Sequence, residues 1–140
     1  MAFSDIYHIS GSAMTAQTIR LNTIASNLAN AETGTVSEEA VYKARRPVFA
    51  AVLKNDELMD YGALTGARVQ VLDVVETGNA VERYEPRSPL ANARGYVYYP
   101  DINVVEEMAD MMSASRNFET NVEILNNVKS MQQSLLRLGE

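Results

Sequence analysis

The sequence has no cysteine, a single histidine and no run of about 18 apolar residues in its 140 residues. Without cysteine the chain can form neither disulfides nor thiolate metal sites, so it is indifferent to the redox state of its compartment. The missing apolar run argues against a transmembrane helix. The sequence has 12 Lys and Arg residues and 18 Asp and Glu residues, and the resulting net charge of -6 is untypical of nucleic-acid binders. We therefore expect one domain whose partner is neither a membrane nor a nucleic acid.

The longest periodic stretch, residues 103–138, contains neither glycine nor proline and is predicted to form one helix. Asn103 is a predicted cap, with Glu106 reaching back to it as in a capping box. Apolar residues at alternating steps of four and three predict a seam along one side of this helix. The seam consists of Val104, Met108, Met111, Ser115, Phe118, Val122 and Leu125, and after a shorter step it continues through Val128, Met131, Leu135 and Leu138.

A second amphipathic segment at the start of the chain is the predicted partner of that helix. Its seam has the same spacing and consists of Phe3, Tyr7, Ser10, Met14, Gln17, Leu21, Ile24, Leu28 and Ala31. Polar seam positions such as Ser10 and Gln17 reduce stability but can fix register and partner choice. The polar run 30–39, with Gly34 in its middle, is predicted to end the helix.

The middle of the chain, residues 36–100, is predicted to be rich in β-structure. Strands are predicted over 41–53 and 68–76, with a loop over 55–66 between them. Gly78-Asn79 is a predicted hairpin turn before a strand over 80–84, and a further extended piece covers 94–99. The predicted fold is therefore α+β: residues 1–35 and 101–140 pair as a coiled-coil-like helical domain, and a small β-rich insert, 36–100, lies between them.

Candidate chemistry is scarce. A lone histidine on a helix, here His8, is far more often a surface or packed residue than a base or ligand. Glu106 and Glu107 are already explained by capping and by the helix dipole, and residues 101–103 lack the later ligands of a calcium loop. We expect no catalytic, metal or cofactor site. Arg45 and Arg46 are interpreted as a solvated basic pair, with contact to an acidic neighbour as the less frequent alternative.

Apolar residues on the two predicted helices exceed what one helix pair can bury, which usually marks an assembly surface. We therefore predict a polymer subunit. Met108, Met111 and Met112 fit either an adaptable binding face or ordinary core packing. The predicted assembly interface consists of Met14, Leu21, Ile24, Asn27, Leu28, Asn30, Met108, Met111, Met112, Phe118, Val122, Leu125, Val128, Met131, Leu135, Leu136 and Leu138.

One segment carries a resemblance to a known family. Residues 21–33, Leu-Asn-Thr-Ile-Ala-Ser-Asn-Leu-Ala-Asn-Ala-Glu-Thr, resemble the N-terminal signature of bacterial flagellar rod and hook proteins. The C-terminal half resembles the basal-body rod members of that family, through Gly95-Tyr96-Val97, the segment 99–108, Ser115-Arg116 and Asn121-Val122-Glu123. The chain departs from the family pattern at 35–41, where a turn with glycine and proline is usual, and at Arg87-Ser88-Pro89, where a His-Pro pair is common.

This resemblance implies a structural subunit of the proximal rod, assembling through its terminal helices into the hollow axial shaft that transmits torque and passes exported subunits. It also implies export through the flagellar type III apparatus to the periplasm. Residues 1–30 lack a cleavable secretory signal, which by itself would predict a cytoplasmic protein. Implied partners are further copies of the chain, other rod proteins, the FliE adaptor and the inner-membrane ring, with no cofactor or small-molecule substrate. The alternatives are a soluble helical-hairpin adaptor and an enzyme that uses the clustered acids.

Overall fold

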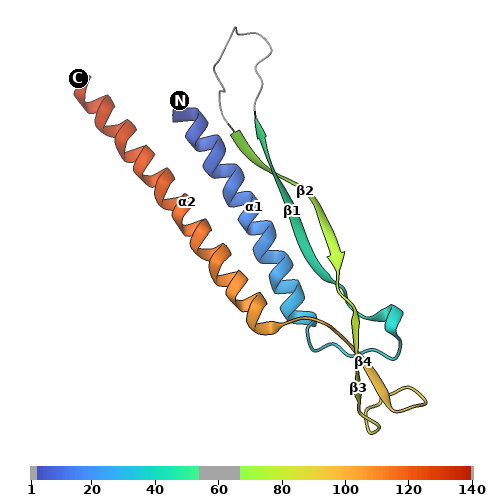
Figure 1. The fold of residues 1–140 in the computed structure, drawn as a ribbon. Coiled ribbons are helices and arrows are strands. Elements are labelled where there is room, and N and C mark those ends of the chain that lie inside the picture. Colours follow the sequence, from blue (N-terminus) through green and yellow to red (C-terminus); the bar gives the residue numbers. More distant parts are fainter. Residues whose placement is uncertain (1–2, 54–66, 140) are drawn as a thin grey trace.

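The computed structural model describes residues 3–53 and 67–139, and it is built around two long helices. Helices α1 (Phe3–Asn30) and α2 (Val104–Leu138) run antiparallel, side by side (Figure 1). The paired strands β1 (Ala44–Leu53) and β2 (Ala67–Thr77) lie along α1, on the side away from α2 in this view. A smaller pair, β3 (Ala80–Tyr84) and β4 (Tyr96–Pro100), lies beyond the ends of the helices. The α+β prediction is confirmed.

The ends of the helices follow local side-chain chemistry. Asn103 caps α2, because its Oδ1 atom accepts hydrogen bonds from the backbone N–H groups of Val105 at 3.1 Å and Glu106 at 3.4 Å. The Glu106 carboxylate turns toward Arg46, with 4.0 Å between Oε1 and Nη2, instead of completing a capping box. After α1 the chain passes through a 3-10 turn (Glu38–Ala40) on its way to β1. In the described part of the chain, no helix is both long and apolar enough to cross a membrane.

The two sheets are separate, and this overturns the predicted hairpin at Gly78-Asn79. β2 pairs with β1, from Ala44 opposite Thr77 onward, whereas β3 pairs with β4. Gly78 has a φ of 109°, a conformation that favours glycine, but the chain does not reverse there and passes from one sheet into the other (Figure 1). The sequence signal was local, and it could not show that β2 already has a partner. The loop predicted over 55–66 lies outside the described residues.

The hydrophobic core is thin and built mostly from small residues. The buried apolar side chains are Ala16, Ile24, Ala31, Val41, Ala44, Val97, Ala114 and Val128. The predicted seam of α2 is partly wrong: Val104 and Met108 are exposed, whereas Glu107 and Ala114 are buried. The seam residues from Met111 to Val128 are partly or fully buried, so the difference lies in the first turns of α2. An apolar stripe on the sequence does not reveal which of two apolar faces meets the neighbouring helix.

Gly34 tests the packing where α1 leads into the sheets. A Cβ atom at this position would lie 2.8 Å from Cγ1 of Val97, which is fully buried. Gly34→Ala should therefore lower the free energy of unfolding by about 1 to 3 kcal/mol, as for other overpacked sites. Denaturant unfolding of the purified protein, followed by circular dichroism, measures this.

Gly11→Ala is the matched control. No atom lies within 4 Å of a Cβ built at Gly11, in the middle of α1, so this change should raise stability by up to about 1 kcal/mol through helix propensity. Equal stabilities for the two variants would show that the approach of Gly34 to Val97 does not constrain the fold.

Candidate assembly surface

The face of α2 that points away from α1 carries an apolar patch. Val105, Met108 and Met112 are 75%, 55% and 59% exposed, and they are spaced by three and four residues. At about 100° per residue, Val105 lies half a turn from the buried Ala114, so this patch faces solvent in the single chain. We call these three residues the outer patch. Exposed clusters of large apolar side chains commonly mark protein interaction sites.

A second exposed apolar cluster lies at the C-terminal end of α2. Met131, Leu135, Leu136 and Leu138 are between 50% and 83% exposed. Near this end the hydroxyl of Tyr7 donates a hydrogen bond to Oε1 of Gln132 at 3.0 Å, which ties the first turns of α1 to α2. The four exposed side chains are thus available to a neighbouring molecule.

The predicted interface residues fall into three groups in the structure. Three are buried within the chain itself: Ile24, Asn27 and Val128. Six are exposed: Met108, Met112, Met131, Leu135, Leu136 and Leu138. The remaining eight are partly exposed: Met14, Leu21, Leu28, Asn30, Met111, Phe118, Val122 and Leu125. Their role between subunits stays a prediction, and the exposed group is the part of it with free surface.

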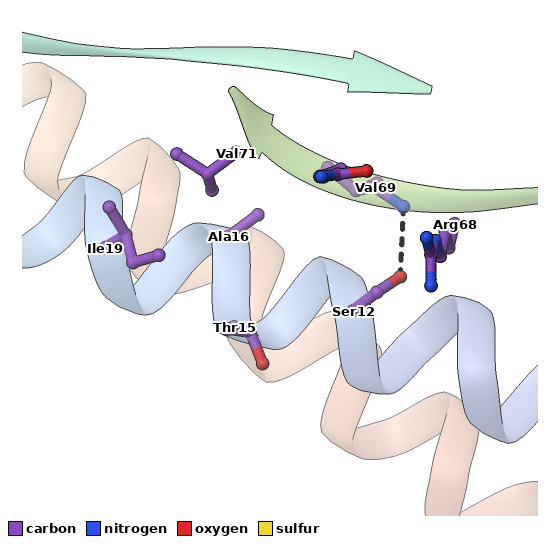
Figure 2. A pocket seen from close by; sticks show the side chains of 8 residues that line it. Ser12, Thr15, Ala16, Ile19, Arg68, Val69 and Val71 are labelled. Carbon is purple, nitrogen blue, oxygen red and sulfur yellow. Dashed lines mark hydrogen bonds between the residues drawn. The ribbon is translucent and has the colours of Figure 1, made fainter. Parts of the chain in front are cut away.

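A groove between α1 and β2 lies on another side of the molecule, and the sequence reasoning missed it (Figure 2). It has a volume of about 420 Å³ and is lined by Ser12, Thr15, Ala16, Ile19, Arg68, Val69, Gln70 and Val71. Ser12 joins its two walls, since its Oγ accepts a hydrogen bond from the Val69 backbone N–H at 3.0 Å and donates one to the Ile9 carbonyl at 2.9 Å. No local motif relates these segments, so only the tertiary fold brings them together.

A buried polar junction joins α1, β1 and α2, and Asn27 is at its centre. The Asn27 amide pairs with the backbone of Arg45 in both directions: Nδ2 donates to the carbonyl at 3.0 Å, and Oδ1 accepts from the N–H at 2.8 Å. The remaining positions are filled by the Tyr42 hydroxyl, which donates to Oδ1 at 3.0 Å, and by Glu107, which accepts from Nδ2 at 3.1 Å. Asn27 is 1% exposed and its hydrogen-bonding capacity is complete.

Charged side chains complete this junction. Glu107 is 3% exposed, and its other carboxylate oxygen lies 3.4 Å from Nη2 of Arg46. The Asp110 carboxylate forms ion pairs with two arginines: Oδ2 lies 3.8 Å from Nη1 of Arg46, and Oδ1 lies 3.1 Å from Nη2 of Arg20. On β1 the guanidinium of Arg45 lies 3.6 Å from the Glu76 carboxylate, so the less frequent alternative, contact with acidic neighbours, holds for both arginines. The pairing follows from the fold, which brings α2 to β1.

The described residues offer little for catalysis or metal binding. His8 is exposed on α1, and no group of three His, Asp or Glu side chains in the described ranges could hold a metal ion. In the smaller sheet, burial raises the pKa of the Tyr99 hydroxyl above its ordinary value, and the hydrogen bond that it donates to Glu85 at 3.1 Å raises it further. The guanidinium of Arg83 lies 4.5 Å from the centre of the Tyr99 ring. These contacts serve the architecture of the sheet.

Asn27→Asp tests the junction. It replaces two N–H donors by a second carboxylate oxygen, which would face the Arg45 carbonyl and the Glu107 carboxylate. We expect the free energy of unfolding to fall by about 3 kcal/mol, because buried groups lose their partners and like charges meet. Thermal and denaturant unfolding measure the loss. The control is Asn22→Asp, an exposed position of the same helix, which should change stability by less than about 0.5 kcal/mol. A similar loss in both variants would contradict a special role for Asn27.

Comparison with known proteins finds two family matches, one toward each end of the chain. Residues 8–34 match the family described as flagella basal body rod protein, and residues 93–138 match the family described as flagellar basal body rod FlgEFG protein C-terminal. The two matched segments cover almost all of α1 and α2. The matches therefore include α2, the helix that carries both exposed apolar clusters.

Relatives match along the whole chain. The flagellar basal-body rod protein FlgC of Escherichia coli O157:H7 is 47% identical, and that of Salmonella typhimurium is 45% identical, each with 100% of both chains covered. The FlgC protein of Borreliella burgdorferi is 32% identical over 97% of this chain and 96% of its own length. The resemblance seen in the sequence is thereby confirmed: the chain belongs to the FlgC family of flagellar basal-body rod proteins, and it is a structural protein of that rod.

Proposed function

We propose that the chain assembles through the exposed faces of its two long helices into the proximal part of the rod, a hollow axial shaft that transmits torque and passes exported subunits. One observation carries the proposal. The outer patch and the C-terminal cluster of α2 leave seven large apolar side chains at least half exposed in a chain whose own core is thin. A closed helical-hairpin adaptor, the alternative function, would be expected to cover such surface within one chain.

Assembly would supply the burial that the single chain lacks. Burying one Met or Leu side chain is worth roughly 1.5 to 3 kcal/mol, so several in each subunit can offset the loss of translational and rotational freedom on association. Coiled-coil-like packing of the helices, with side chains of one helix seated between those of the next, belongs to the same proposal. Folding of the helix ends and polymerisation would then be coupled.

Torque transmission would rest on how tightly such helices pack. Packed side chains reach the density of organic crystals and cannot be compressed cheaply, so a tube of interdigitated helices resists twisting. Residues 1–35 and 101–140 would form the inner tube, and the insert 36–100 would face outward and contact neighbours. The paired strands β1 and β2 lie along α1, which is consistent with an outer layer over an inner helical one (Figure 1).

The proposed location is the periplasm, reached through the flagellar type III export apparatus. Proposed partners are further copies of the chain, other rod proteins, the FliE adaptor and the inner-membrane ring. Membership of a structural family favours a non-enzymatic role, without a cofactor, a small-molecule substrate or nucleic acid. The net charge of -6 fits the proposal that the chain does not bind nucleic acid.

Leu136→Asp tests assembly through the end of α2. Leu136 is 74% exposed, so the change should leave unfolding of the monomer nearly unaltered, whereas a carboxylate placed in a packed subunit contact would cost several kcal/mol. We expect normal export, no incorporation into purified basal bodies and loss of swimming. The control is Gln133→Asp, which adds the same charge at an exposed polar position of the same turn. Normal incorporation of Leu136→Asp would show that this end of α2 is not an assembly surface.

Hydrogen exchange distinguishes a rod subunit from a closed adaptor. In the purified chain, amides near the end of α2 should exchange fast, because few contacts hold that end, and amides around the Asn27 junction should exchange slowly. In assembled basal bodies the end of α2 should become protected. Strong protection of that end in the monomer would favour the adaptor function instead.

A further inference from the structure

We propose that neighbouring copies of this chain pack side by side. In this contact the outer face of α2 from Met112, the last residue of the outer patch, to Glu119 in one copy is seated in the α1–β2 groove of the next. This inference rests on the proposed function and names the two surfaces that meet. The two surfaces lie on different sides of the molecule. The outer patch faces away from α1, whereas the groove lies where α1 meets β2 (Figures 1 and 2). Such a contact is heterologous, and it repeats from copy to copy around an axis.

The two surfaces lie at the same level of the molecule. Arg20 of α1 contacts Asp110 of α2, so Ile19, at one end of the groove, is level with the turn of α2 that contains Met112. Two copies standing side by side at equal height therefore bring Met112 of one opposite Ile19 of the other. No axial shift between the copies is required.

The spacing along the two helices also agrees. Seven residues, roughly 10.5 Å of helix, separate Met112 from Glu119, which lies on the same outer face of α2. Seven residues also separate Ile19 from Ser12 at the other end of the groove. Because α2 and α1 run in opposite directions at this contact, Met112 opposite Ile19 brings Glu119 opposite Ser12. Ser12 holds the Val69 N–H, and the side chain next to it on β2 is Arg68.

Charge and shape fit this pairing. Arg68 and Glu119 are both exposed, and neither forms an ion pair with any side chain of residues 3–53 and 67–139. Arg68 of one copy and Glu119 of the next would form an ion pair across the contact. The apolar part of the groove, made by Ala16, Ile19 and Val71, is of a kind that accepts flexible methionine side chains (Figure 2). A second copy of this chain therefore presents Met112 to the apolar part of the groove and the Glu119 carboxylate to Arg68.

Disulfide cross-linking in basal bodies tests the register, and the absence of native cysteine makes the readout clean. A chain with Met112→Cys and Ile19→Cys should form disulfide-linked dimers and higher oligomers of itself on oxidation. The control, Val105→Cys with Ile19→Cys, uses the same face of α2 seven residues away and should cross-link at least five-fold less. Equal cross-linking of the two pairs, or a product that contains a different rod protein, would overturn the proposal.

A second test swaps the charges of Glu119 and Arg68, and it does not depend on whether the cysteine variants are incorporated. Glu119→Arg and Arg68→Glu should each reduce incorporation into basal bodies, and the double exchange should restore it. Failure of the double exchange to restore incorporation would overturn the proposed contact. So would efficient incorporation of the Met112/Ile19 cysteine pair without cross-linking, although the rod function would then stand. Absence of the unaltered chain from basal bodies would refute the rod function itself.

Discussion

The side chain of Asn27 determines how the rest of the structure is arranged. By pairing with both backbone groups of Arg45, its amide acts like one residue of an extra strand, and it fixes the start of β1 against α1. The same amide holds Glu107, which places the first turn of α2. Three elements distant in sequence thus meet at one residue. A buried amide with every donor and acceptor occupied tolerates few alternatives, so it specifies geometry more than it adds stability.

The polar junction and the thin apolar core have complementary roles. With small residues such as Ala16 and Ala114 between its elements, the single chain gains little from hydrophobic burial, while large apolar side chains remain outside. Directional hydrogen bonds therefore define the shape of the subunit. The large apolar side chains stay exposed in the single chain, and the proposed assembly would bury them. In such a subunit, hydrogen bonds can define the shape before assembly, and assembly can then supply most of the stabilisation of the folded state.

Much of this architecture could be predicted from the sequence, because it depends on local signals. The two helices, the cap at Asn103 and the β-rich middle follow from periodicity and composition. The errors arise where contacts between segments distant in the sequence determine the structure. The chain at Gly78 passes from one sheet to the other instead of closing a hairpin, and the pairing of Arg46 with Glu107 depends on a contact between distant segments. The α1–β2 groove could not be predicted at all, since its walls come from separate parts of the chain.

The inward position of Glu107 at the start of α2 has a physical consequence for the surface of the subunit. In the first turns of α2 the predicted seam residues Val104 and Met108 stay exposed. Instead α2 turns Glu107 inward, where Asn27 and Arg46 satisfy it, and this leaves Met108 and Met112 on the opposite face. A buried carboxylate is tolerated only where such partners are present. The polar junction inside the subunit is thus what permits an apolar surface outside it.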